Sequence, residues 1–296
     1  MNSENGFLNI NKPIGITSMD VVRHIRRATK TKKVGHGGTL DPNASGVIPV
    51  ALGQATRLLE YVLNGPKRYI AELEIGKQTD TFDSEGLLVN EVSYTNITKQ
   101  KIEEIVSSYK GTTKQIPPMF SALRHNGKRM YDLARMGILI EQNPREVTLT
   151  YVEVLAYRAP IIKIELHSSK GFYVRSFAND IGNQLGCGAY LKNLQRIQSS
   201  CFKFKNSIDL DSAVKKISDN KIDEIIIEMG SALIDMPEIQ LSAIESQDIM
   251  HGKKIQKLEQ SDAILHKAYD NNNKFIAIVK YDPKYNICEP EKVFIY

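Results

Sequence analysis

The chain has 296 residues, of which 42% are hydrophobic and 25% are charged. This usage is ordinary for a folded globular protein and excludes extended disorder. The net charge is +5, and the basic excess lies in the first part of the chain: residues 1–35 hold seven Lys and Arg against two Asp and Glu, whereas residues 236–296 hold eight against nine. Such an excess indicates either a polyanionic partner or a solvated basic face.

The cysteines and the N-terminal segment bear on the cellular compartment in which the protein is expected. Cys187, Cys201 and Cys288 form no CxxC pair and are odd in number, which argues against a disulfide framework or a structural zinc site and favours reducing conditions. The N-terminal segment lacks the features of a signal peptide, and no apolar stretch approaches the roughly 18 residues of a membrane span. We therefore expect a soluble cytoplasmic protein with no membrane contact.

In chain order, the first third of the sequence predicts short, mixed elements. Residues 7–11 are predicted to form a strand, and Ser18 is predicted to cap a helix with one apolar face. The Gly- and Pro-rich stretch 35–50 follows, then a helix over 53–63. The alternation of residues 68–76 predicts a half-buried strand.

The rest of the chain mixes strands and helices without a regular βαβ alternation. The predicted elements are a helix at 97–109, a strand, turn and helix over 121–137, strands at 147–157 and 161–169, a helix at 173–186 and a strand at 190–204. This pattern predicts an α+β fold with a mixed, largely antiparallel sheet. From Pro237 onward, turns separate short apolar runs, so we predict two domains, 1–236 and a small β-rich domain at 237–296.

The stretch GHGGTLDPNASGVIPV (35–50) invites several interpretations. It lacks the GxxxxGK[ST] of a phosphate loop, no GxSxG accompanies its HGG, and the six histidines of the chain form no HExxH. Asp41 remains as the candidate. Pro42 restricts it to an extended or turn conformation, and the preceding glycines permit close backbone approach. On local chemistry alone, an ordinary Asp-Pro-Asn turn is still the simpler interpretation.

Five segments, in order and with fitting spacings, change that balance. They are LNINKPIGITS, GHGGTLDPNASGVIPVALGQATRL, KRYIAELEIGKQTDTFDSEG, QIPPMFSALRHNGKRMYDLARMG and SKGFYVRSFANDIGNQLGCGAYLKNLQRI. Together they closely resemble the TruB-type tRNA pseudouridine-55 synthases over residues 6 to about 205. Residues 237–296 resemble the family's PUA-like RNA-binding domain in pattern only.

The resemblance implies an isomerase of the pseudouridine synthase fold that acts on one uridine in the T-loop of tRNA. The base is flipped out, its glycosidic bond from C1′ to N1 is broken, and C1′ is rejoined to C5. Substrate and product have the same atoms, so the resemblance implies no cofactor, energy source or metal. We also expect a monomer with no obligatory protein partner.

The resemblance assigns roles to seven residues. Asp41 corresponds to the essential aspartate, Arg175 to the guanidinium that favours its charged form, and Tyr69 to the aromatic residue that stacks on the reacting base. His36 corresponds to a residue inserted beside the flipped nucleotide. The residues that correspond to the pocket lining are Lys12, Tyr173 and Leu194.

Two departures and two alternatives accompany this interpretation. The family's usual pair of arginines reads Gln195-Arg196 here and a customary glycine reads Ser200, changes that we expect to affect local RNA contacts rather than the chemistry.

The basic residues of 23–33 are expected to meet tRNA phosphates. The alternatives are a guide-RNA-dependent synthase acting on ribosomal RNA and a tRNA-binding folding factor in which catalysis is secondary.

Overall fold

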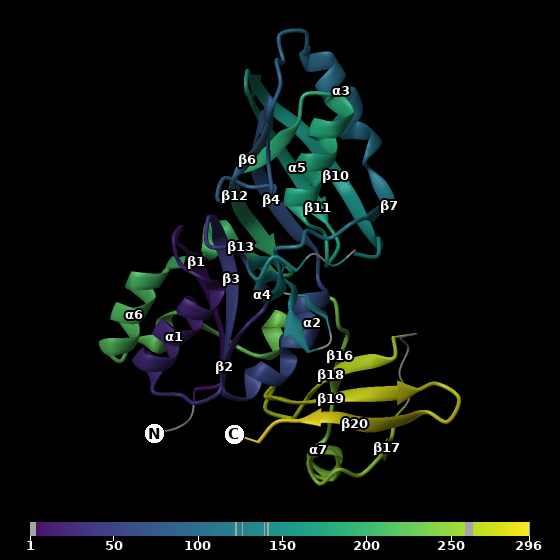
Figure 1. Ribbon diagram of the computed structural model, residues 1–296. Helices are drawn as coiled ribbons and strands as arrows, with labels where there is room; N and C mark the ends of the chain where they lie inside the picture. The colour runs from purple at the N-terminus through teal and green to yellow at the C-terminus, as the bar shows by residue number, and fades with distance from the viewer. Residues whose placement is uncertain are drawn as a thin grey trace.

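The computed structural model describes residues 4–121, 123–125, 127–138, 140, 142–257 and 263–295. In these residues a mixed sheet of eleven strands runs through the molecule (Figure 1). Its main path is β14 (Ile208–Asp209), β1 (Gly6–Lys12), β3 (Ala44–Leu52), β12 (Ala189–Ser199), β4 (Lys67–Ile75), β11 (Ile161–Ser168), β10 (Arg145–Arg158) and β7 (Gly111–Gln115). Off this path are β2 (Val34–His36), β13 (Phe202–Lys203) and β15 (Ile226–Ile227).

Strand directions confirm the predicted fold class. Along the main path, only β1–β14 and β3–β12 pair in parallel, and the other neighbours are antiparallel. Two smaller hairpins are formed by β5 (Lys77–Thr79) with β6 (Leu88–Glu91) and by β8 (Arg124–His125) with β9 (Lys128–Arg129). The fold is therefore α+β with a mixed, largely antiparallel sheet.

Helices cover the sheet in two groups. At the β1 end lie α1 (Ser18–Thr29) and α6 (Leu210–Ser218), and at the β10 end lie α3 (Lys99–Ser108) and α5 (Val174–Leu185) (Figure 1). Two short helices, α2 (Leu59–Asn64) and α4 (Met130–Arg135), complete this part. None of the helices in the described ranges is both long and apolar enough to cross a membrane.

The start of α1 differs by one residue from the prediction. Thr17, not Ser18, is the N-cap, and its hydroxyl accepts from the Asp20 backbone while the Asp20 carboxylate accepts from the Thr17 backbone. Ser18 is buried, and its hydroxyl does not cap the helix. It accepts a hydrogen bond from Leu40 N at 2.8 Å and donates one to Leu40 O at 3.0 Å. The basic residues that follow are all exposed: Arg23, Arg26, Arg27, Lys30, Lys32 and Lys33.

The stretch 35–50 is mostly strand, which the sequence did not predict. β2 and β3 both run through it, and Pro49 lies inside β3 opposite Asn9. Gly46 is where β3 comes against β12: its φ is +104°, and a Cβ there would lie 2.3 Å from the Arg196 carbonyl oxygen. Only glycine fits this contact without moving one strand away from the other.

We expect Gly46→Ala to lower the free energy of unfolding by at least ~2 kcal/mol, because it adds a backbone clash to an unfavourable φ. Urea denaturation followed by circular dichroism measures the loss. The matched control is Gly171→Ala, whose φ is +82° but whose Cβ would meet nothing within 4 Å. Equal losses in the two variants would show that the contact with β12 contributes nothing.

The C-terminal part forms a sheet of its own but shares a core with the rest. The strand order in the described residues is β16 (Glu238–Gln240), β18 (Leu265–Tyr269), β19 (Phe275–Asp282), β20 (Ile287–Val293) and β17 (Ile255–Gln256), with α7 (Ala243–Met250) packed alongside. Phe275 and Phe294 belong to the same buried cluster as Phe7 and Leu58. The predicted β-rich C-terminal region is thus confirmed.

Candidate active site

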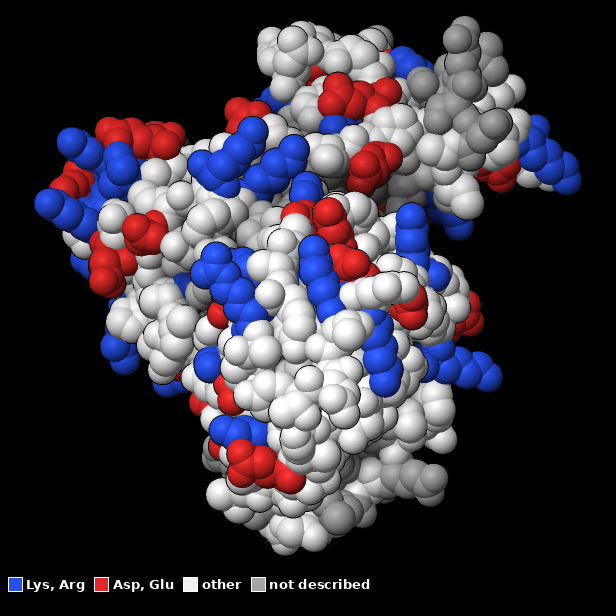
Figure 2. All heavy atoms as spheres, turned by 90° about the horizontal axis from the view of Figure 1, so that it is seen from above, with Lys and Arg blue, Asp and Glu red and all other residues white. Residues whose placement is uncertain are grey.

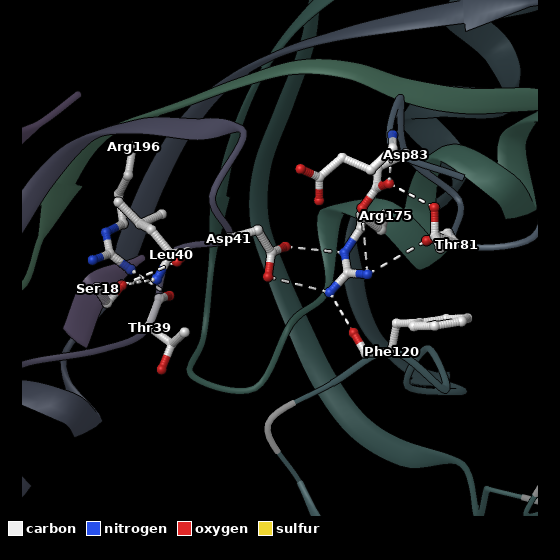
Figure 3. A network of polar contacts seen from close by, with 10 residues as sticks. Ser18, Thr39, Leu40, Asp41, Thr81, Asp83, Phe120, Arg175 and Arg196 are labelled. Carbon is white, nitrogen blue, oxygen red and sulfur yellow. Dashed lines mark hydrogen bonds and ion pairs between the residues drawn. The ribbon is translucent and has the colours of Figure 1, made fainter. Parts of the chain in front are cut away.

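Asp41 and Arg175 meet although 134 residues separate them. Asp41 lies in the loop between β2 and β3, and Arg175 lies in the first turn of α5. The Arg175 Nε lies 3.0 Å from Asp41 Oδ2, and its Nη2 donates to Asp41 Oδ1 at 3.3 Å. Figure 3 shows this two-pronged contact at the centre of the site. A bidentate pair of this kind fixes the orientation of the carboxylate as well as its charge.

Arg175 is also held from its other side. Its Nη1 lies 3.4 Å from Asp83 Oδ2 and donates to Thr81 O at 3.4 Å, while Nη2 donates to Phe120 O at 2.8 Å (Figure 3). The guanidinium is only 6% exposed, whereas the Asp41 side chain is 41% exposed. The buried cation is thus anchored by the protein, and the carboxylate in front of it stays accessible.

Opposing influences act on the pKa of Asp41. Desolvation raises it above the usual value, the Arg175 guanidinium and the Lys12 ammonium lower it, and the Asp83 carboxylate raises it further. Desolvation is the largest of these. Arg175 therefore counteracts the tendency of this partly desolvated carboxylate to take up a proton.

A cavity of about 600 Å³ opens in front of Asp41, a size typical of small-ligand sites. Its lining includes five of the seven residues that the sequence singled out: Asp41, Tyr69, Tyr173, Arg175 and Leu194. They come from the β2–β3 loop, β4, the start of α5 and β12. The fold thus gathers residues from four distant segments around one cavity.

Lys12 and His36 lie outside that lining. Lys12 is fully buried, and its ammonium donates to the carbonyl oxygens of Pro13 at 2.9 Å, Ile16 at 2.7 Å and Pro42 at 3.1 Å. Burial lowers its pKa to about 8. Lys12 thus supports the Asp41 loop from behind. His36 lies on β2, where burial lowers its pKa.

Sequence reasoning missed the surroundings of Arg196 and of Lys67. Arg196, the arginine of the pair at 195–196 that is unchanged here, is 2% exposed and donates to the Val47 carbonyl at 2.7 Å. Lys67 is 6% exposed and donates to Leu63 O and to Gly65 O at 2.5 Å. Ser200 has a φ of +52°, a left-handed conformation that glycine adopts more easily than serine.

Charges on the outer surface are mixed rather than segregated. Figure 2 shows Lys and Arg side chains interspersed with Asp and Glu over the face seen from above. Where β4, β11 and β12 run side by side, cations pair with carboxylates: Arg68 with Glu165 at 2.7 Å, Lys163 with Glu72 at 3.5 Å and Lys192 with Glu74 at 2.8 Å. In contrast, the cavity lining contains several cations: Lys67, Arg145, Lys170, Arg175 and Arg196.

Comparison with known proteins identifies the class. The sequence profile of the TruB family pseudouridylate synthase N-terminal domain matches residues 26–174. A tRNA pseudouridine synthase B of Dehalococcoides mccartyi is 40% identical over 98% of this chain and 96% of that protein. The one of Clostridium kluyveri is 42% identical over 92% of this chain and 94% of that protein. These matches define an isomerase of the pseudouridylate synthase class.

The fold agrees with this class over nearly the whole length. A crystal structure of a Cbf5-Nop10-Gar1 complex contains a chain with a TM-score of 0.75 and 25% identity, covering 98% of this chain and 85% of that one. The chain belongs to the TruB family of pseudouridylate synthases.

Proposed function

We propose that this protein isomerises one uridine in the T-loop of tRNA to pseudouridine and acts without a guide RNA or a protein partner. The observation that carries the proposal is the Asp41–Arg175 pair at the cavity, with an accessible carboxylate at 3.0 Å from a buried guanidinium. Two relatives that are 40% and 42% identical to this chain carry the name tRNA pseudouridine synthase B. The proposal includes a cytoplasmic location, where a tRNA substrate is found.

The reaction needs an ionised carboxylate at the sugar. The bond from C1′ to N1 breaks, the base turns, and C1′ forms a bond to C5; the proton leaves C5 and one is returned to N1, so atoms balance without a co-reactant. Asp41 acts at the sugar as nucleophile or base, and both roles require its deprotonated form. Arg175 supports that form because it lowers the pKa of Asp41.

The cavity has the means to hold a flipped nucleotide. Tyr69 is on its wall, and stacking of a base on an aromatic ring is worth roughly 1–3 kcal/mol, which offsets the few kcal/mol that unstacking in the loop costs. Leu194 and Tyr173 line the same cavity. We propose that His36, on β2 next to this loop, inserts into the RNA beside the extruded nucleotide.

Purified protein mixed with an unmodified tRNA transcript is expected to form pseudouridine at the T-loop uridine. Carbodiimide labelling and primer extension locate the product, and nucleoside chromatography quantifies it. A transcript with cytidine at that position is the control and is expected to give no product. Activity that appears only after addition of a guide RNA or a cell fraction would favour the guide-dependent alternative. RNA binding without any product would favour the folding factor.

A further inference from the structure

In the loop that carries Asp41, every backbone carbonyl from residue 38 to residue 42 accepts a hydrogen bond from the protein. Arg196 donates to Gly38 O at 3.0 Å and to Thr39 O at 3.3 Å, and Ser18 donates to Leu40 O at 3.0 Å. Ala44 N donates to Asp41 O at 3.1 Å, and Pro42 O accepts from Gly15 N at 2.9 Å and from Lys12 at 3.1 Å. Loops seldom have all their carbonyls paired within the protein, since water usually serves them. Each of these carbonyls therefore has a hydrogen-bond partner within the protein.

Arg196 contributes most to this arrangement. Its guanidinium binds two consecutive loop carbonyls and, through Nε, the Val47 carbonyl of β3 at 2.7 Å. Figure 3 shows Arg196 beside Thr39 of the loop. A buried guanidinium normally needs a carboxylate, because removing its charge from water is costly. In the described part of the chain, the partners of Arg196 are carbonyl oxygens and a phenol instead.

That phenol belongs to Tyr69. Arg196 on β12 lies directly opposite Tyr69 on β4 in the register of the two strands. Burial lowers the pKa of Arg196, and the interaction with the Tyr69 phenol opposes this by raising it. One side chain therefore contacts both the loop of the reacting carboxylate and the ring proposed to stack on the base.

We propose that Arg196 is a positioning residue that sets Asp41 and Tyr69 at a fixed separation across the cavity, with Ser18 as a second support of the loop. The proposal rests on the proposed function, in which both groups face the same nucleotide. It assigns Arg196 no contact with the sugar or base. Its effect is expected on the rate of reaction of bound RNA rather than on RNA affinity.

The geometry makes lysine a poor replacement. A guanidinium presents five N–H groups in a planar fork, whereas an ammonium is a single point of charge that cannot reach several carbonyls and the phenol together. Displacing a reacting group by about 1 Å costs on the order of 100-fold in rate. Arg196→Lys keeps the charge and removes the fork, so it isolates positioning from electrostatics.

The test measures single-turnover rates at saturating tRNA, together with the Kd for tRNA and the Tm. We expect Arg196→Lys to slow the reaction about 100-fold and Ser18→Ala about 10-fold, with Kd changed less than threefold. The matched control is Lys267→Met in the C-terminal sheet, a buried cation that bonds to Gly230 O at 3.5 Å and to Glu238 at 2.8 Å. It is expected to lower the Tm and keep the single-turnover rate.

A double-mutant cycle separates positioning from general stability. Because Arg196 acts in part through the Tyr69 hydroxyl, Tyr69→Phe and Arg196→Lys are expected to slow the reaction together by less than the product of their single effects. Wild-type rates in Ser18→Ala and Arg196→Lys, or rate losses that merely follow the Tm as in the control, would overturn the proposal. An inactive wild-type protein in the same assay would instead overturn the proposed function.

Discussion

Asp41→Asn is expected to abolish pseudouridine formation, with a loss of at least about 10⁴-fold, while the protein folds and binds tRNA as before. Asparagine has the same shape but neither a negative charge nor a useful nucleophilic or basic oxygen. The carboxylate is 41% exposed and faces the cavity, so its loss leaves no buried group of Asp41 itself unpaired. Single-turnover product formation and equilibrium binding of tRNA measure the two properties.

The matched control for this variant is Asp180→Asn. Asp180 lies on α5, the same helix as Arg175, and burial raises its pKa as it does that of Asp41, but it is not part of the cavity lining. Asp180→Asn is expected to react at the wild-type rate. Turnover by Asp41→Asn within tenfold of the wild type would remove Asp41 from its proposed role.

Arg175→Ala is expected to reduce the single-turnover rate roughly 10²–10³-fold and the affinity for tRNA only a few-fold. The guanidinium lies between Asp41 and Asp83, so its removal leaves two carboxylates facing each other without a cation. Arg175→Lys keeps a positive charge and is expected to retain more activity. A loss of affinity alone, with an unchanged rate of bound RNA, would show that Arg175 is only a phosphate contact.

The pH dependence gives a second measurement on the same variants. Asp41 acts when ionised, so activity is present above its pKa in the folded protein and is lost as the pH falls through it. Desolvation raises that pKa and Arg175 lowers it. The acid limb of the wild-type rate profile is therefore expected above the range of an ordinary aspartate, and in Arg175→Ala it is expected at still higher pH. Coinciding limbs in the two proteins would contradict the ion pair.

Local sequence patterns were sufficient to predict elements with a clear hydrophobic periodicity or a clear end signal. The strand 68–76 was predicted from alternation, and β4 (Lys67–Ile75) buries Tyr69, Ala71 and Leu73 on one side. The glycine expected to end the helix that became α5 does so: Gly186 has a φ of +78° at its C-cap. In contrast, glycines and Pro49 concealed β3, because its pairing with β1 and β12 overrides the local propensity of these residues.

For the site, candidate residues were expected from the sequence, whereas the residues that support them were not. Asp41, Tyr69 and Arg175 were expected from the resemblance to the family, and the structure brings them to one cavity. Arg196 was missed because its role depends on strand register: it acts through Tyr69 and the Val47 carbonyl, which only the pairing of β12 with β4 and β3 brings near. Asp83 was missed because its link to Arg175 spans two segments that no local pattern connects.

The core shared by the two ends of the chain has a consequence for how the protein can be divided. Phe294, two residues from the C-terminus, packs in one cluster with Phe7 near the N-terminus, and the Arg57 guanidinium lies 5.0 Å from its ring. Arg57 also donates to Val293 O at 2.5 Å. The C-terminal sheet therefore contributes to a core that it shares with the N-terminal strand β1. Cutting the chain between the two sheets would expose the apolar side chains of this cluster to water.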